Sequence, residues 1–435
     1  MKKFFPEVSY QVRKFILKRQ SLWSLGSQGL AAFAGLLVFG ITSSRLTKED
    51  FGIWILFVSI STLMDMFKTG LLFPGFLQQA AGVSKIKKRN IFYSVSVLFA
   101  GISVLQAILC LFLSFVVSDS PSLYFFFMFY PWIMLSGAIM LLGEWWLQMN
   151  NRFHGILILR LLNRFLLVVI VFFYLANKTD IIYITSLCNA ITGILLISMG
   201  MLPKIKWRQL SREVISKLVW FARYATPSQL ASNLLRSSDT FLISHYLGSA
   251  ATGVYGVAAR FLEFIELPVR SAGAVHYNQL ARLIKTGETR KALHFLVNQT
   301  AKTTLTILPI AILLGVLAPY LIELLSGNQY SDSVAILQIM AIYCLLIPAD
   351  RYIGLFLEAI GRPDLNMIKV MAMLILNVLA DVLAIIIFKT PLAVAITSII
   401  TFILGVILGG WLVIHKASPD QPNYINFKLF LISKP

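Results

Sequence analysis

Two apolar segments in the second half of the chain carry several ionisable side chains, and the chemistry of these residues is the most informative feature of the sequence. The first segment contains Arg223, Arg236, Asp239 and His245, and the second contains Arg260, Glu263, Glu266 and Arg270. An ionisable side chain at the centre of a membrane-spanning helix costs about 2.5–3.5 kcal/mol on the insertion scale. Several such residues on neighbouring spans therefore indicate a polar cavity inside a helical bundle, and a polar ligand that the cavity handles.

Arg236 and Asp239 lie three residues apart on one face of the first segment. Arginine suits a diphosphate because its planar fork donates two parallel hydrogen bonds and keeps its charge. An aspartate in a low-dielectric cavity can take up a proton, which a proton-coupled carrier would use. The pattern favours substrate binding by Arg236 and proton or ion coupling by Asp239, and a self-paired structural dyad is the alternative.

In the second segment, Glu263, Glu266 and Arg270 fall within about 60° of one another on a helix, with Arg260 at the flank. Two interpretations of this face stay open. The i,i+3 and i,i+4 spacings fit ion pairs that neutralise one another and hold helices together. The same face would also suit a cavity wall, in which Arg260 and Arg270 bind the substrate and the two glutamates couple an ion.

The best candidate in the first half is Arg164, roughly 12 Å along the helix axis from the nearer end of its span. No acidic residue lies in the same span, so its partner must come from another helix or from the substrate. Arg160, one turn earlier, and Lys68, on the second span, are interpreted as side chains that snorkel to the interface. Trp145 and Trp146 are interpreted as part of an interfacial aromatic belt.

Composition sets the class of protein that positions these residues. The chain has 435 residues, of which 58% are hydrophobic and 13% charged, and its mean hydropathy is +0.79. A soluble protein carries about 25% charged residues. Apolar runs of about 20 residues predict membrane-spanning helices. The three cysteines, Cys110, Cys188 and Cys344, lie in such runs and are predicted to be small buried hydrophobes.

Several function classes are excluded or disfavoured. The net charge of +19 is concentrated in short loops, which argues for a topology signal and against nucleic-acid binding. The chain has no G-x-x-x-x-G-K-[ST] loop for ATP, and no His/Cys cluster has metal-ligand spacing. We therefore expect no cofactor, no metal and no nucleic acid.

The pattern predicts an all-α polytopic membrane protein with about twelve spans. The predicted spans are approximately Ser21–Arg45, Phe51–Gly70, Ile91–Val117, Leu123–Gln148, Ile156–Ala176, Ile181–Leu202, Leu218–Leu247, Thr252–Val275, Thr303–Leu325, Val334–Ile360, Asn366–Phe388 and Leu392–His415. Lysine and arginine gather in alternate loops and in both terminal segments, so the positive-inside rule places both termini in the cytoplasm. Pro348 in the tenth span predicts a kink.

The longest predicted connections, Pro203–Lys217 and Leu280–Lys302, both lie on the basic side. The first divides the chain, which yields the predicted organisation. This comprises a cytoplasmic amphipathic arm (1–20), a six-helix bundle (21–202), a basic linker (203–217), a second six-helix bundle (218–415) and a cytoplasmic tail (416–435).

The two halves repeat. Ser27-Gln28, Ser43, Leu46 and Gly52 match Ser228-Gln229, Ser244, Leu247 and Gly253 at one constant offset (253 − 52 = 201), and Trp54 faces Tyr255 at the same offset. With an even number of spans in each half, the repeats are parallel and related by an axis along the membrane normal.

These motifs resemble a known family. The first span contains Gln28, ends in Arg45-Leu46 and is followed by Phe51-Gly52; the seventh span restates the pattern in Thr226 to Gln229, Asp239, His245 to Gly248 and Thr252 to Tyr255. The pattern resembles the polysaccharide biosynthesis or oligosaccharide flippase family, the Wzx-type O-antigen flippases. This family belongs to the MOP superfamily, with the MATE drug exporters and the lipid II flippases.

The resemblance implies a transporter and not an enzyme. Such a protein moves an undecaprenyl-diphosphate-linked oligosaccharide, such as an O-antigen unit for lipopolysaccharide, across the bacterial inner membrane by alternating access. Coupling to an ion gradient is expected. Membrane lipids and other polysaccharide assembly proteins are the further partners that the resemblance suggests.

Two other functions remain as alternatives. A MATE-like exporter of organic cations would need an acidic cavity, whereas here the intramembrane arginines at least match the carboxylates in number. A membrane-embedded polysaccharide polymerase or ligase would need catalytic groups on a substantial outer loop, and the outer loops are short.

Overall fold

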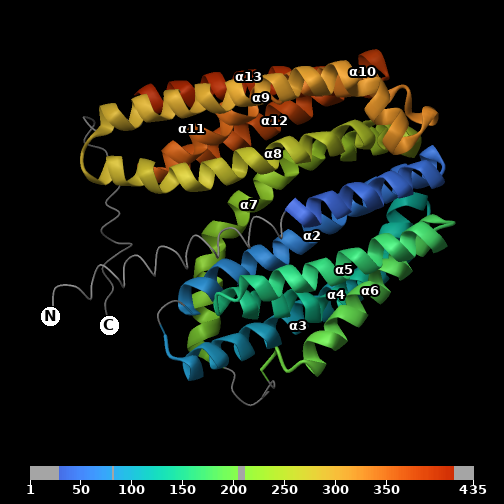
Figure 1. The fold of residues 1–435 in the computed structure, drawn as a ribbon, viewed down its shortest axis with the longest axis vertical. Coiled ribbons are helices and arrows are strands. Elements are labelled where there is room, and N and C mark those ends of the chain that lie inside the picture. Colours follow the sequence, from blue (N-terminus) through green and yellow to red (C-terminus); the bar gives the residue numbers. More distant parts are fainter. Residues whose placement is uncertain (1–28, 81–82, 204–210, 416–435) are drawn as a thin grey trace. The chain divides into compact units, whose positions relative to one another are not determined.

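The computed structural model describes residues 29–80, 83–203 and 211–415, and every regular element in this part of the chain is a helix (Figure 1). The helices are Gly29–Arg45, α2 (Lys48–Ala80), α3 (Lys85–Val116), α4 (Pro121–Met149), α5 (Phe153–Tyr174), α6 (Lys178–Ser198), α7 (Arg212–Tyr246), α8 (Gly248–Lys285), α9 (Thr289–Ser326), the 3₁₀ helix η1 (Asn328–Tyr330), α10 (Ser333–Tyr343), α11 (Ile347–Ala359), α12 (Pro363–Phe388) and α13 (Pro391–His415). The predicted arm, residues 21–28 of the first span, the centre of the predicted linker (204–210) and the tail lie outside the described residues.

Each predicted span coincides with a helix or with a bent helix pair. Eight of the described helices are long and apolar enough to cross a membrane, and α10 with α11 would form a ninth span that bends by 43°. The remaining predicted spans correspond to Gly29–Arg45 and to the charged helices α7 and α8. The prediction of an all-helical, multi-pass membrane protein is therefore confirmed.

Local sequence sets where the helices begin. Pro121 and Pro363 stand in the first turns of α4 and α12, where their missing N–H groups break no helical hydrogen bond. Asn177 and Asp180 form a capping box at the start of α6. These devices keep the connections short, so each helix begins at a defined residue.

The prediction that Leu280–Lys302 is a long loop is wrong. Helix α8 continues to Lys285 and α9 begins at Thr289, so most of this segment is helical. The chain turns at Gly287, whose φ of 76° lies in the left-handed region that glycine tolerates. The two helices therefore extend well beyond their predicted membrane spans.

The chain forms two compact units. Unit 1 comprises the chain up to Arg260 together with Pro319–Ser333, and unit 2 comprises Phe261–Ala318 and the chain from Val334 onward. The domain boundaries proposed from the sequence follow the repeat instead, and they stay predictions.

In unit 1, helices α2 to α6 pack side by side, and α7 lies along α2 (Figure 1). An aromatic cluster fills the space between α2, α3 and α4, where Trp145 packs against Phe73, Phe76 and Phe99. Trp145 is buried, so its assignment to an interfacial belt is wrong. Cys110 and Cys188 are buried free thiols in this unit, as predicted.

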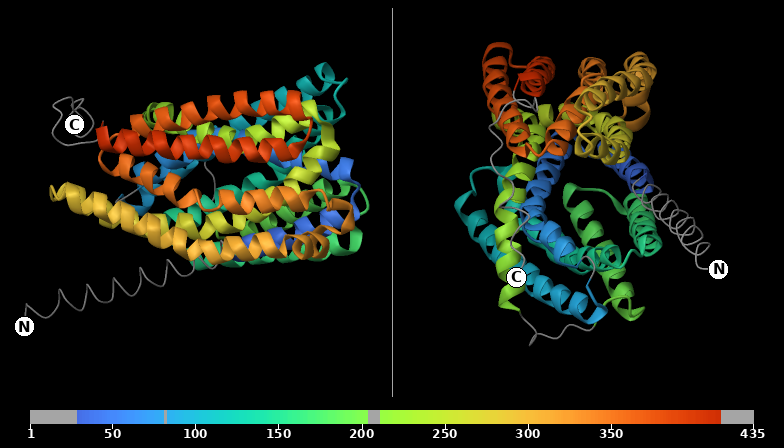
Figure 2. Two further views of the ribbon diagram at one scale, coloured as in Figure 1. Left: turned by 90° about the horizontal axis from the view of Figure 1, so that it is seen from above. Right: turned by 90° about the vertical axis from the view of Figure 1, so that its left-hand side faces the viewer.

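In unit 2, α12 and α13 lie side by side, and α11 packs against both (Figure 2). Helix α10 ends at Tyr343 and α11 begins at Ile347, with Pro348 in its first turn. The predicted kink near Pro348 is confirmed as a break between two short helices. Cys344, at this break, is buried and free.

Candidate functional site

Arg164 lies in the middle of α5 in unit 1, next to a residue that ties α5 to α6. The buried Asn163 donates hydrogen bonds from Nδ2 to Asn189 Oδ1 (3.1 Å) and Thr192 Oγ1 (3.3 Å), both on α6. Because adjacent helical residues point about 100° apart, Arg164 and Asn163 lie on different faces of α5. The hydrogen bonds of Asn163 hold α5 against α6 and so fix the place of the Arg164 backbone within unit 1.

An acid near Arg164, Glu144, is paired with another arginine. Glu144 on α4 accepts two hydrogen bonds from Arg160, one from Nε and one from Nη2, each 2.9 Å long. This bidentate geometry is the strongest arrangement for an arginine and a carboxylate. Arg160 therefore pairs with an acid of a neighbouring helix, a role that the snorkelling interpretation did not include.

Among the described residues, Arg164 has no such partner. Within the described residues it forms no hydrogen bond and no ion pair, although Glu144, Arg160 and Arg260 are near enough to act on its charge. Two of these three neighbours are cations. A partly buried guanidinium in this setting favours an anionic ligand, because a buried charge is costly unless it is paired.

Arg260, at the unit 1 end of α8, contributes a second cation. Its guanidinium lies over the ring of Phe39, 5.6 Å from the centroid, and this contact stabilises the charge. Gly35 makes room for it: an added Cβ at Gly35 would lie 2.9 Å from Arg260 Nη2. The helix Gly29–Arg45 thus supplies both a ring and a gap that position this arginine.

On α7, Asp239 is buried, with 7% of its surface exposed, whereas Arg236 is exposed. The hydroxyls of Tyr255 on α8 and of Ser238 donate hydrogen bonds to the Asp239 carboxylate. Tyr255 belongs to the repeated motif, but its counterpart Trp54 has no hydroxyl and stacks on Phe57. The repeated motif therefore places an aromatic residue at the same position in both halves, but among the described residues only Tyr255 in the second half bonds to an acid there.

Unit 2 contains the other candidates. Glu266 and Arg270 form an i,i+4 ion pair on α8, and Glu263 is exposed. The pair agrees with the self-neutralising interpretation of these two residues. Substrate binding by Arg270 and ion coupling by Glu263 and Glu266 stay predictions. The side chain of Arg223 lies outside the described residues.

Lys68 on α2 does not snorkel, and that interpretation is wrong. Only 1% of its surface is exposed, its ammonium lies 4.7 Å from the centroid of the Phe99 ring, and it is 3.5 Å from Asp65 Oδ1. Asp65 also accepts a hydrogen bond of 2.9 Å from the Tyr130 hydroxyl. These contacts link α2, α3 and α4 through one buried cation.

Sequence reasoning missed two buried ionic groups in unit 2. Asp381 on α12 is fully buried and accepts hydrogen bonds from Asn377 Nδ2 (2.7 Å) and Thr397 Oγ1 (2.6 Å). Lys369, 1% exposed, donates to Asp350 Oδ1 at 2.6 Å. An acid or a lysine inside an otherwise apolar span was the available signal, because such residues are functional candidates by default.

The helical fold is similar to those of solved transporters of the MOP superfamily. The structure is similar to an inward-facing MATE family multidrug resistance transporter (TM-score 0.75, 14% identity, 91% of this chain and 98% of that chain). It is also similar to the lipid II flippase MurJ in an inward closed conformation (TM-score 0.74, 15% identity, 90% and 87%). A MOP superfamily transporter from Pyrococcus furiosus is a further structural relative (TM-score 0.62, 13% identity, 92% and 95%).

The sequence itself identifies the family. A family model for polysaccharide biosynthesis proteins matches residues 44–335, which is more than half of the chain. The chain therefore belongs to this family of polysaccharide biosynthesis proteins, which confirms the resemblance drawn from its motifs. Among curated proteins, none matches the chain.

Proposed function

We propose that this protein is a flippase that moves an undecaprenyl-diphosphate-linked oligosaccharide across the bacterial inner membrane. The observation that carries the proposal is the environment of Arg164. This arginine is a partly buried cation in the middle of a span, without an ion pair among the described residues, and the Glu144 carboxylate near it is engaged by Arg160. Membership of a polysaccharide biosynthesis family supports the class of substrate.

The charge around Arg164 favours an anionic headgroup over an organic cation. Arg164 is partly buried and forms no ion pair among the described residues, and the Glu144 carboxylate near it is paired with Arg160. A diphosphate would be attracted to such a site because guanidinium groups bind phosphate oxygens in bidentate fashion. A MATE-like exporter of cations would need the opposite balance of charge.

In the proposed mechanism, the cytoplasm-open state admits the diphosphate and its first sugars to the arginines. The lipid tail remains in the bilayer. Closure on one side and opening on the other then expose the headgroup to the periplasm, as alternating access requires. Arg236, Arg260 and Arg270 are proposed as further contacts to the substrate.

The test of this function is deletion of the gene followed by analysis of lipid-linked intermediates. We expect complete undecaprenyl-linked units to accumulate on the cytoplasmic side, because synthesis continues while export stops. Single units displayed on the outer side would instead identify a polymerase or ligase. Normal polymer together with greater sensitivity to cationic drugs would identify an exporter.

We also propose that Asp239 couples transport to an ion gradient. Asp239→Asn removes a buried negative charge while keeping the shape of the side chain, so transport should fall by about tenfold and its dependence on pH or sodium should disappear. The loss of one charged hydrogen-bonding partner corresponds to about 1.5–3 kcal/mol. Uptake of a lipid-linked oligosaccharide into inverted vesicles, measured over a range of pH and with and without sodium, would check this result.

Tyr255→Phe is the matched control for Asp239, because it removes the hydroxyl that donates to Asp239 and leaves the acid in place. Its effect on transport should be smaller, with the ion dependence retained. An Asp239→Asn protein that keeps the ion dependence of the wild type contradicts the assignment.

A further inference from the structure

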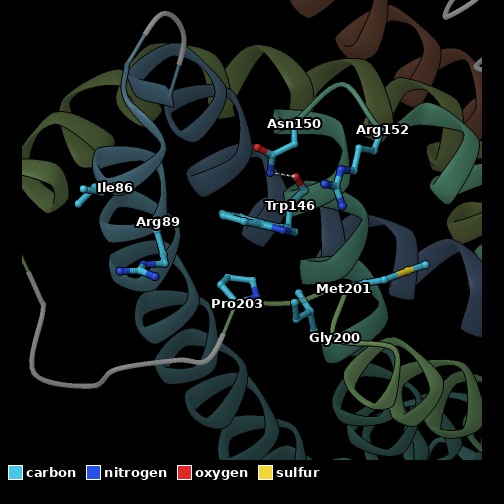
Figure 3. Close-up of a pocket in the computed structure, with 9 residues that line it drawn as sticks. Ile86, Arg89, Trp146, Asn150, Arg152, Gly200, Met201 and Pro203 are labelled. Atoms are coloured by element: carbon cyan, nitrogen blue, oxygen red, sulfur yellow. Dashed lines mark hydrogen bonds between the residues drawn. The ribbon is translucent and has the colours of Figure 1, made fainter.

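A pocket of about 380 Å³ lies at the end of unit 1 where α3 and α5 begin and where α4 and α6 end. Arg89 on α3 and Arg152, just before α5, lie on either side of Trp146 (Figure 3). The segment from Gly200 to Pro203, which follows α6, forms a further wall. This volume falls within the usual range for small-molecule sites.

Two turns of the same kind shape the pocket. After α4, Asn151 has a φ of 57°, and the N–H of Arg152 donates to the carbonyl of Leu147 (2.9 Å). After α6, Gly200 has a φ of 61°, and the N–H of Met201 donates to the carbonyl of Leu196 (3.2 Å). A left-handed residue followed by this hydrogen bond is the Schellman ending of a helix. The backbone around the pocket is therefore built by helix ends whose hydrogen bonds are satisfied.

The pocket carries positive charge that the described residues leave uncompensated. Arg89 and Arg152 are exposed, and neither guanidinium donates a hydrogen bond or forms an ion pair within the part of the chain that the structure describes. None of the nine residues drawn around the pocket is acidic (Figure 3). Two arginines beside a concave surface suit a phosphate group, because their forks match phosphate oxygens.

The second half of the chain offers a contrast. Its fourth and fifth spans are joined by the same kind of turn, in which Gly361 has a φ of 80° and the N–H of Arg362 donates to the carbonyl of Leu357. There the guanidinium of Arg362 makes three hydrogen bonds to Asp364. In the first half the residue two positions after Arg152 is His154. Only the first half therefore presents this arginine to a ligand.

We propose that this pocket binds the phosphate group of an anionic membrane lipid from the cytoplasmic leaflet. Arg89 lies near the start of α3 in a cluster of basic residues with Lys85, Lys87 and Lys88, and the positive-inside rule predicts that this cluster faces the cytoplasm. Basic pockets between membrane helices on that side bind anionic lipid headgroups. Trp146 has the side chain that favours the interface between headgroups and acyl chains, and Ile86 on the rim is 68% exposed. The inference does not depend on which substrate the protein transports.

The experiment uses the full-length protein, purified in detergent, stripped of lipid and titrated with phosphatidylglycerol while binding is followed by native mass spectrometry. Arg89→Ala and Arg152→Ala should each weaken binding roughly fivefold, because a basic residue near an anionic membrane surface contributes about 1 kcal/mol. Arg362→Ala is the matched control and should leave binding unchanged. Thermal unfolding of each variant checks the fold, which we expect to hold because neither arginine has an internal partner within the described residues.

Three outcomes would overturn the proposal. The first is wild-type affinity for phosphatidylglycerol in the double variant. The second is equal dependence of neutral phosphatidylcholine binding on the two arginines, which would exclude recognition of net negative charge. The third is complete displacement of phosphatidylglycerol by soluble pyrophosphate at equal concentration, which would mark a site for free diphosphate and not for a bilayer lipid.

Discussion

Arg164→Ala is expected to lower surface polysaccharide by tenfold or more while the amount of protein in the membrane stays unchanged. Net hydrogen bonding to a charged group contributes about 1.5–3 kcal/mol, and about 1.4 kcal/mol is a factor of ten in an equilibrium constant. Within the described residues Arg164 makes no ion pair or hydrogen bond, so its removal breaks no internal contact of that kind. Immunoblots of the polymer and of the membrane fraction would measure both quantities.

Two further variants make the Arg164 result interpretable. Arg290→Ala removes an exposed arginine from the first turn of α9 and should leave polymer levels at those of the wild type. Arg164→Lys keeps the charge but loses the planar fork, so it should restore only part of the activity if the fork binds a diphosphate. Wild-type polymer in Arg164→Ala, or loss of the protein from the membrane, would remove Arg164 from the proposed site.

The fold could be predicted from the sequence because the bilayer restricts the choices. A span must be an apolar run of about 20 residues whose backbone bonds close within the helix, so hydropathy and loop charge were enough to place each helix. The helix extensions around Gly287 and the burial of Trp145 were not predicted, because local hydropathy reports neither helix extensions beyond the membrane nor contacts between helices.

The site was harder to predict because ion pairs form between helices. Glu144 lies 16 residues from Arg160 in the chain, yet the two side chains meet in a bidentate pair. No spacing pattern within one helix predicts a partner on another helix. Arg160 was therefore interpreted from the sequence as a side chain that snorkels to the interface. Arg164 was singled out for the opposite reason, since its own span contains no acid; the structure gives it no ion pair among the described residues, and its role in the site stays a prediction.

The repeat read from the sequence has a physical role at the start of α2 and α8. An added Cβ at Gly52 would lie 1.6 Å from the carbonyl oxygen of Ser249, and one at Gly253 would lie 2.7 Å from that of Lys48. The four positions are related by the repeat offset (249 − 48 = 201 and 253 − 52 = 201). Each half thus presses a glycine against the equivalent backbone of the other half, which lets the two helix ends cross in close contact.

Gly52→Ala should consequently destabilise the protein strongly, although it adds only one methyl group. The methyl group would meet a backbone carbonyl, which cannot rotate away as a flexible side chain can, so the two helices must separate. Overpacking typically costs about 1–3 kcal/mol and occasionally more, and this contact should reach or exceed the upper end. Gly101→Ala is the control, because nothing lies within 4 Å of an added Cβ there and alanine favours a helix by about 1 kcal/mol over glycine. Thermal unfolding of the purified proteins should therefore show a lower unfolding temperature than the wild type for Gly52→Ala and an equal or higher one for Gly101→Ala. Equal stability of both variants would contradict the close crossing of α2 and α8.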